Sequence, residues 1–120
     1  MAANRIAGTA FVKRDGVQYA LKGALTIQPL DTSREGVAGT DGIHGFKEVA
    51  VVPYIEVEVT KTPELSLKAL QGVTDSTVTA ECADGTVYAL RNAWFSGLAE
   101  LDGVEGQVTL RFEGLSCMEI

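Results

Sequence analysis

Few residues of this chain could take part in chemistry, and two of them share one face of a predicted strand. In the segment KEVAVVPYIEVEVTKT, Glu56 and Glu58 alternate with Val57 and Val59, so the two carboxylates point to the same side. A general acid and base pair needs a pocket and two different pKa values. No histidine, cysteine or serine base stands beside these glutamates. The pattern therefore favours a solvated polar face over catalysis.

The other reactive side chains are isolated in the sequence. His44 is the single histidine, which argues against histidine-based triads and multi-histidine metal sites. Cys82 and Cys117 have no CxxC partner, so two free, buried or half-buried thiols are predicted. The glycine-rich stretch around His44 lacks the GxGxxG spacing and is followed by no Gly-Lys-Ser or Gly-Lys-Thr, so it does not resemble a phosphate-binding loop. We therefore predict no catalytic residue, no cofactor and no metal.

Composition limits the class of protein. The chain has 120 residues, of which 46% are hydrophobic, and this length fits one domain over residues 1–120. Its formal net charge is -6, which argues against a nucleic-acid groove because affinity for phosphate comes mainly from Lys and Arg. The N-terminal residues lack an apolar core of signal-peptide length, and no stretch is long enough to span a membrane. A soluble protein that is made in the cytoplasm is expected.

The positioning elements are mostly strands. Apolar residues alternate with polar ones over residues 17–28, 54–60 and 107–113, the period of two that a half-buried strand has. A further strand is predicted over residues 5–13, and hairpin turns are predicted at Asp15-Gly16 and Asp84-Gly85. Over residues 62–72 we expect one short α-helix, with Thr62 as its N-cap, Pro63 as its first residue and Gly72 after its end. With at least six strands, the predicted fold is a mostly β antiparallel β-sandwich or a partly open β-barrel.

The long loop over about residues 28–48 is the feature around which the chain is organised. Its glycines recur at every third position, and glycine disfavours helix and strand interiors, so regular structure is not expected. Apolar and charged side chains punctuate it, which predicts a segment that becomes ordered against a partner. Folding back over its own domain is the alternative. The predicted contact residues are Arg34, Glu35, Val37, Ile43, His44, Phe46, Lys47 and Glu48.

Trp94 and Phe95 form the densest aromatic pair of the second half. We interpret them as core or subunit-contact anchors rather than as a platform for a small molecule.

Long segments of the chain resemble the tail tube protein of Mu-like, contractile-tailed bacteriophages. The resemblance spans nearly the whole sequence and is carried by NRIAGTAFVK, LKGALTIQP, REGVAGTDGIHGFKE, PYIEVEVTKTPELSLKAL, VYALRNAWFSG and EGQVTLRFEG. It implies a β-barrel-like subunit, similar to type VI secretion tube proteins, that forms rings of six stacked into a hollow tube. The tube would lie in the virion tail and be built from subunits made in the host bacterial cytoplasm. The implied partners are other copies of the chain and the sheath, tape measure, baseplate and terminator proteins.

The resemblance also assigns roles to two sets of residues. Residues 34–48 would reach a neighbouring subunit or ring, while DNA would pass through the tube without specific binding and without any membrane contact. Glu56 and Glu58 are candidates for the lumen wall, because an acidic wall would let DNA slide. Two alternatives stay open: a tube protein of a headless contractile particle or secretion system, and a monomeric ligand-binding β-barrel whose loop closes over a pocket.

Overall fold

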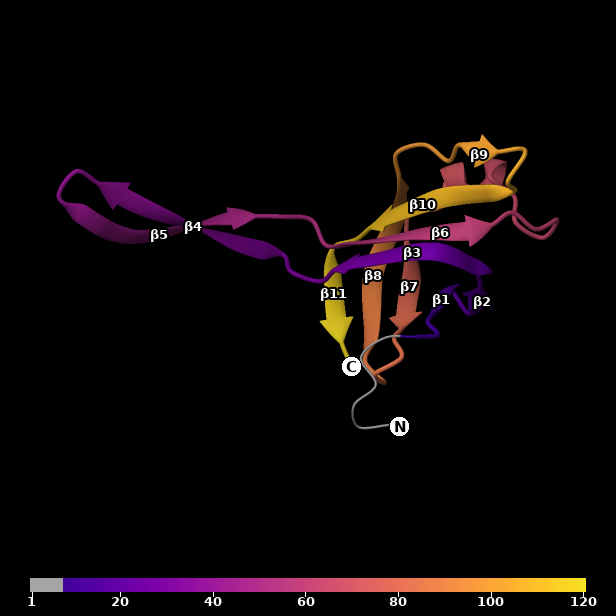
Figure 1. Ribbon diagram of the computed structural model, residues 1–120, viewed down its shortest axis with the longest axis horizontal. Helices are drawn as coiled ribbons and strands as arrows, with labels where there is room; N and C mark the ends of the chain where they lie inside the picture. The colour runs from indigo at the N-terminus through magenta and orange to yellow at the C-terminus, as the bar shows by residue number, and fades with distance from the viewer. Residues whose placement is uncertain (1–7) are drawn as a thin grey trace.

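The computed structural model describes residues 8–120 as an antiparallel β-structure with one 3-10 helix, η1 (Figure 1). The predicted mostly β, partly open fold is confirmed, because the sheets do not close into a barrel. The elements are β1 (Phe11–Arg14), β2 (Val17–Gln18), β3 (Leu21–Gln28), β4 (Thr32–Gly39), β5 (Gly42–Ala50), β6 (Tyr54–Thr60), η1 (Lys68–Gly72), β7 (Ser76–Glu81), β8 (Val87–Ser96), β9 (Leu101–Asp102), β10 (Gln107–Glu113) and β11 (Ser116–Glu119).

Two layers of strands are joined by β8. One layer runs β2-β1-β7-β8-β11, and the other contains β3, β6, β10 and β9. The first part of β8 pairs with β7 and β11, whereas its end at Trp94–Ser96 pairs with β10. Asn92, where the pairing with β7 shifts register, has a φ of 52°, and its amide donates a hydrogen bond of 2.8 Å to the Asp75 carboxylate. This left-handed residue bends β8 from one layer into the other.

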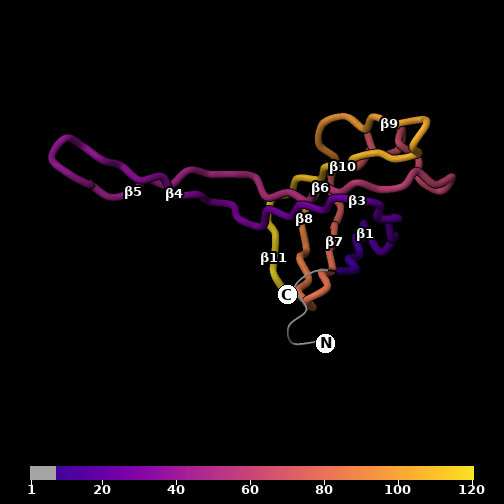
Figure 2. The backbone as a smooth tube through the Cα atoms, in the orientation of Figure 1, coloured from indigo at the N-terminus to yellow at the C-terminus, as the bar shows by residue number. Residues whose placement is uncertain are grey.

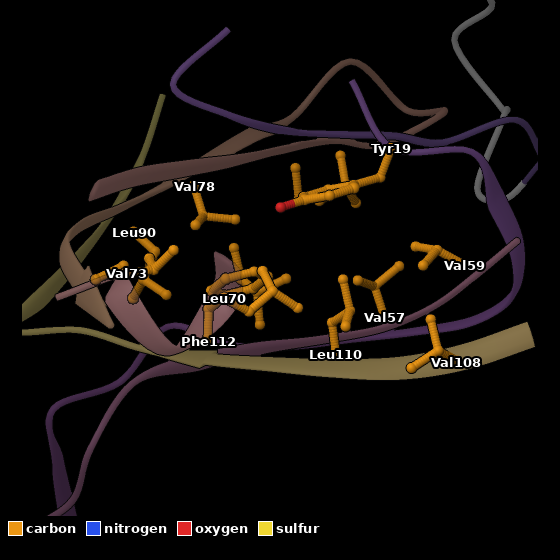
Figure 3. Packing of buried hydrophobic residues seen from close by; sticks show 14 residues of the cluster. Tyr19, Val57, Val59, Leu70, Val73, Val78, Leu90, Val108, Leu110 and Phe112 are labelled. Carbon is orange, nitrogen blue, oxygen red and sulfur yellow. The ribbon is translucent and has the colours of Figure 1, made fainter. Parts of the chain in front are cut away.

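The core lies between the two layers and follows the predicted alternation. Every second residue of β6 and of β10 is buried, which confirms the strand predictions there. Figure 3 shows these side chains meeting others from the opposite layer and from the η1 segment. The largest fully buried side chains are Phe112, Ile55, Leu70, Leu90, Leu110, Val12, Val57, Val59, Val78 and Val108.

The predicted turns are present, but the strand after the first turn changes layers. Asp15 and Gly16 have φ values of 51° and 86°, and Gly85 has a φ of 95°, as tight hairpin turns require. However, β2 ends at Gln18, and β3 pairs with β6 of the opposite layer. Val17 therefore does not share the buried face predicted for residues 17–28 and is 63% exposed. Residues 5–7 of the predicted strand over residues 5–13 lie outside the described residues.

The predicted α-helix over residues 62–72 is wrong in type and extent. The Leu65 N–H donates to the Thr62 carbonyl at 3.0 Å, so Pro63 occupies the second position of a turn, where its fixed φ is favoured. Only Lys68–Gly72 is helical, as a 3-10 helix. Too few residues are present for a stable α-helix in water, and the tighter turn still buries Leu70.

The predicted irregular loop is instead a β-hairpin that projects from the sandwich (Figures 1 and 2). We call β4, β5 and the turn between them, residues 32–50, the arm. β4 and β5 form a two-stranded sheet of their own, and the molecule consequently measures 61 × 38 × 28 Å. As predicted, β3 ends before Pro29, which has no N–H to donate.

Candidate subunit interface

The glycines of the arm allow the hairpin because bulky residues lie across from them. Gly36 is opposite Phe46, and Gly45 is opposite Val37. A side chain on Gly39 would place its Cβ 2.6 Å from the His44 ring. Cross-strand packing of this kind compensates for the weak strand propensity of glycine. The prediction that these glycines exclude regular structure is therefore wrong for the arm.

One face of the arm is apolar near the tip. His44 is an extra residue in β5, since the register shifts between Val37 and Ala38, and this bulge brings Ile43 opposite Ala38 on the same face as Phe46. Closer to the base, the Arg34 guanidinium lies 5.3 Å from the centre of the Phe46 ring. The same Arg34 is 3.8 Å from the Glu48 carboxylate. These contacts hold Phe46 in place on an otherwise uncovered surface.

The other face of the arm carries a second ion pair. Lys47 Nζ lies 3.5 Å from Glu35, next to Val37, which is 38% exposed. At the tip, His44 Nε2 is 2.7 Å from Asp41 Oδ1. The structure thus brings the predicted contact residues together on one arm, although on two faces.

The arm is almost entirely exposed to solvent. Every residue of β5 and all but Ser33 of β4 are exposed, with Ile43 at 88% and Phe46 at 61%. It therefore neither folds back over its own domain nor closes over a pocket, and both of those alternatives from the sequence are wrong for this structure.

The glutamates of β6 differ in their surroundings. Arg111 Nη1 is 3.2 Å from Glu56, and the Arg111 guanidinium lies 3.8 Å from the centre of the Tyr54 ring. Glu58 makes no ion pair within the described residues and lies over Gly23 of β3, where an added Cβ would be 2.7 Å from its carboxylate. Both glutamates line one open hollow of about 210 Å³, but no histidine, cysteine or serine lines it with them. The arrangement therefore favours a polar surface over catalysis.

The remaining residues that could take part in chemistry have structural surroundings. Cys82 and Cys117 are free and half-buried, as predicted, and burial raises the pKa of both thiols, which keeps them protonated at neutral pH. Within residues 8–120, no three His, Cys, Asp or Glu side chains gather as a metal site would require. That part of the chain also has no helix with the length and apolarity to cross a membrane. Phe95 packs edge-on against Phe112, with 5.7 Å between ring centres.

A family model described as phage tail tube protein matches residues 3–119. The chain belongs to that family. As a member of this family, the tail tube protein is a structural protein and not an enzyme. A relative in Haemophilus influenzae, the Mu-like prophage FluMu tail tube protein, is 27% identical over 118 residues, covering 98% of each chain. The resemblance stated from the sequence is confirmed.

Two solved structures share the fold of the tail tube protein. The sheath/tube terminator of an extracellular contractile injection system, PVC, in its extended state matches with a TM-score of 0.65 at 7% identity, covering 92% of each chain. The tube terminating cap of the anti-feeding prophage matches with a TM-score of 0.66 at 8% identity, covering 100% of this chain and 94% of the other.

Sequence reasoning missed a second exposed apolar region of the tail tube protein. It lies in the connection between β8 and β10, where Leu98 and Val104 are 82% and 93% exposed. The available signal was a glycine-containing run, SGLAELDGVEG, with an apolar residue at every third position. The arm has a similar pattern of glycines between apolar residues.

Proposed function

We propose that this tail tube protein assembles into stacked rings of six that form the hollow inner tube of a contractile phage tail. The main support for this proposal is the arm, which exposes Ile43 and Phe46 to solvent. A two-stranded hairpin alone is marginally stable in water. Burying an isoleucine or phenylalanine side chain contributes about 1.5–3 kcal/mol. A neighbouring copy would supply that burial.

The free strand edges support the same proposal. β3 and β11 are edge strands, and exposed edges promote uncontrolled aggregation unless they are covered. An interface between different surfaces of identical subunits closes into a ring or continues as a helical stack. Self-association would thus use the surfaces that otherwise endanger solubility. In the tail, the tube would contact the sheath, tape measure, baseplate and terminator proteins.

The wild-type protein gives the first test. We expect sedimentation and negative-stain microscopy of a concentration series to show rings or tubes at high concentration. The subunit mass is 12.7 kDa, so rings are easily distinguished from single chains. Seeding with preformed tube fragments would remove any nucleation barrier. If only particles of one chain's mass appeared in seeded samples at every concentration, the proposed function would be wrong.

Within the tube, the polar face of β6 is our proposed lumen wall, through which DNA passes without specific binding. Arg111 is shared between Glu56 at 3.2 Å and Glu113 at 3.5 Å, so this face keeps a net negative charge, and Glu58 contributes to it without an ion-pair partner among the described residues. An acidic wall repels duplex DNA, whereas a basic wall would retain it. A phage tail is favoured over a headless particle because the Haemophilus influenzae relative is a tail tube protein of a Mu-like prophage.

We therefore expect Glu58→Lys to slow DNA ejection severalfold while tubes still assemble. The effect should shrink with added salt, because the Debye length falls from about 10 Å at 0.1 M to about 3 Å at 1 M. Ejection from phage particles carrying the variant can be followed by fluorescence of released DNA. Glu81→Lys is the control, since it makes the same charge change in the opposite layer, and Glu81→Gln beside it accounts for the loss of the exposed ion pair with Lys13. Equal ejection rates for both variants and the wild type would contradict the lining role.

A further inference from the structure

A groove lies beside η1 and the segment that follows β8, at the other end of the molecule from the tip of the arm (Figure 1). Its volume is about 490 Å³, within the range of about 300–1,000 Å³ that holds small molecules in proteins. It can therefore receive one or two large side chains. The lining residues are Leu67, Lys68, Gln71, Phe95, Gly97, Leu98 and Ala99.

The wall of the groove combines apolar side chains with the polar Lys68 and Gln71, and contacts with the core fix Phe95 in position. Phe95 packs edge-on against the buried Phe112, and the Phe95 N–H donates to the Val73 carbonyl at 3.1 Å. Leu98, three residues further along the same segment, also lines the groove and is 82% exposed. These apolar side chains contact water in the free subunit. Covering them with another apolar group lowers the free energy.

One charge stands at the groove without a partner. Lys68 lines it and makes no ion pair within residues 8–120. On the arm, Glu35 and Glu48 are neutralised by Lys47 and Arg34. Asp41, at the tip, has only His44 beside it, and its side chain is 80% exposed.

We propose that the tip of the arm from one copy occupies this groove on a neighbouring copy. Ile43 enters the groove, Phe46 covers Leu98 at its rim, and the Asp41 carboxylate pairs with Lys68. The arm of a subunit cannot reach the groove of the same subunit, because the arm projects away from the sandwich (Figure 2). The contact joins two different surfaces, and in the proposed tube it continues head-to-tail from copy to copy, so the groove supplies the acceptor surface that the tube requires. The inference rests on that proposed function.

The test is a charge exchange between Asp41 and Lys68. Both residues are exposed, so the variants should fold like the wild type, which thermal unfolding can verify. Asp41→Lys places two cations together, and Lys68→Asp places two carboxylates together; like charges at an interface oppose association. We expect each single variant to raise the concentration needed for tube formation at least about tenfold, and the double variant to recover most of that loss.

The controls separate this inference from the proposed function. Glu81→Lys makes the same charge change as Asp41→Lys outside the arm and the groove. It also replaces the exposed ion pair between Glu81 and Lys13 by two cations, so thermal unfolding must first show that it folds; it should then assemble like the wild type. Single variants that assemble normally, or a double variant that recovers nothing, would overturn the docking while leaving tube formation intact. The same holds if Lys68→Asp tubes form normally but fail to acquire a sheath, since the groove would then belong to the sheath protein. Failure of the wild type to assemble would instead reject the proposed function itself.

Discussion

Replacing residues 36–46 by Asn-Gly should abolish ring and tube formation while leaving the sandwich folded. The replacement closes the shortened hairpin at the pair Glu35 and Lys47 with a two-residue turn that suits β-hairpins. It removes both Ile43 and Phe46. Since the removed residues are exposed, the free energy of unfolding should stay within about 0.5 kcal/mol of the wild type. Sedimentation and negative-stain imaging would report assembly, and urea unfolding would report stability.

Two further variants identify what the arm contributes. Ile43→Ser with Phe46→Ser keeps the full length of the arm and should lose assembly to the same extent, because the apolar contacts are gone. Val17→Ser removes an apolar side chain that is 63% exposed but lies outside both the arm and the groove, so it should assemble normally. Continued ring formation by the shortened protein would show that the arm is not the interface.

The sandwich could be predicted from sequence because its strands carry local patterns. Every second residue of β6 and β10 is buried, and the residues between them are partly or fully exposed. Register follows from that alternation when one face is buried. The Asp-Gly turns could also be predicted from the sequence, since each needs a positive φ that few residues tolerate. These features need no knowledge of the partner strand.

The arm and the groove could not be predicted because they depend on pairing between distant residues. Gly36 alone disfavours a strand. Its position opposite Phe46 compensates for this, because cross-strand pairs stabilise a sheet. The groove needs Leu67 and Phe95 to meet in space, which no local pattern indicates. The change of layer after Gln18 is a further case, because the alternation of residues 17–28 continues across the break. Sequence therefore singled out the residues of the arm but not the hairpin that presents them.

Phe112→Ala should be the most damaging single substitution for stability. Phe112 is fully buried between the layers, with its ring centre 6.2 Å from that of Tyr19 and 5.7 Å from that of Phe95. Removing a buried phenylalanine side chain costs about 3–5 kcal/mol, a large part of the roughly 5–15 kcal/mol that stabilises a typical domain. Urea unfolding followed by circular dichroism would measure the loss. Assembly should weaken as well, since Phe95 in the groove rests on this ring.

Phe46→Ala is the matched control, because it makes the same chemical change on the arm. With Phe46 being 61% exposed and its contacts confined to the arm, the free energy of unfolding should change by no more than about 0.5 kcal/mol. Assembly should nevertheless fall sharply. The two variants thus separate folding from self-association: one loses stability and, with it, assembly, and the other loses assembly alone. Equal destabilisation by both would mean that the arm packs on its own sandwich in solution, and the arm would then be unable to serve a neighbour.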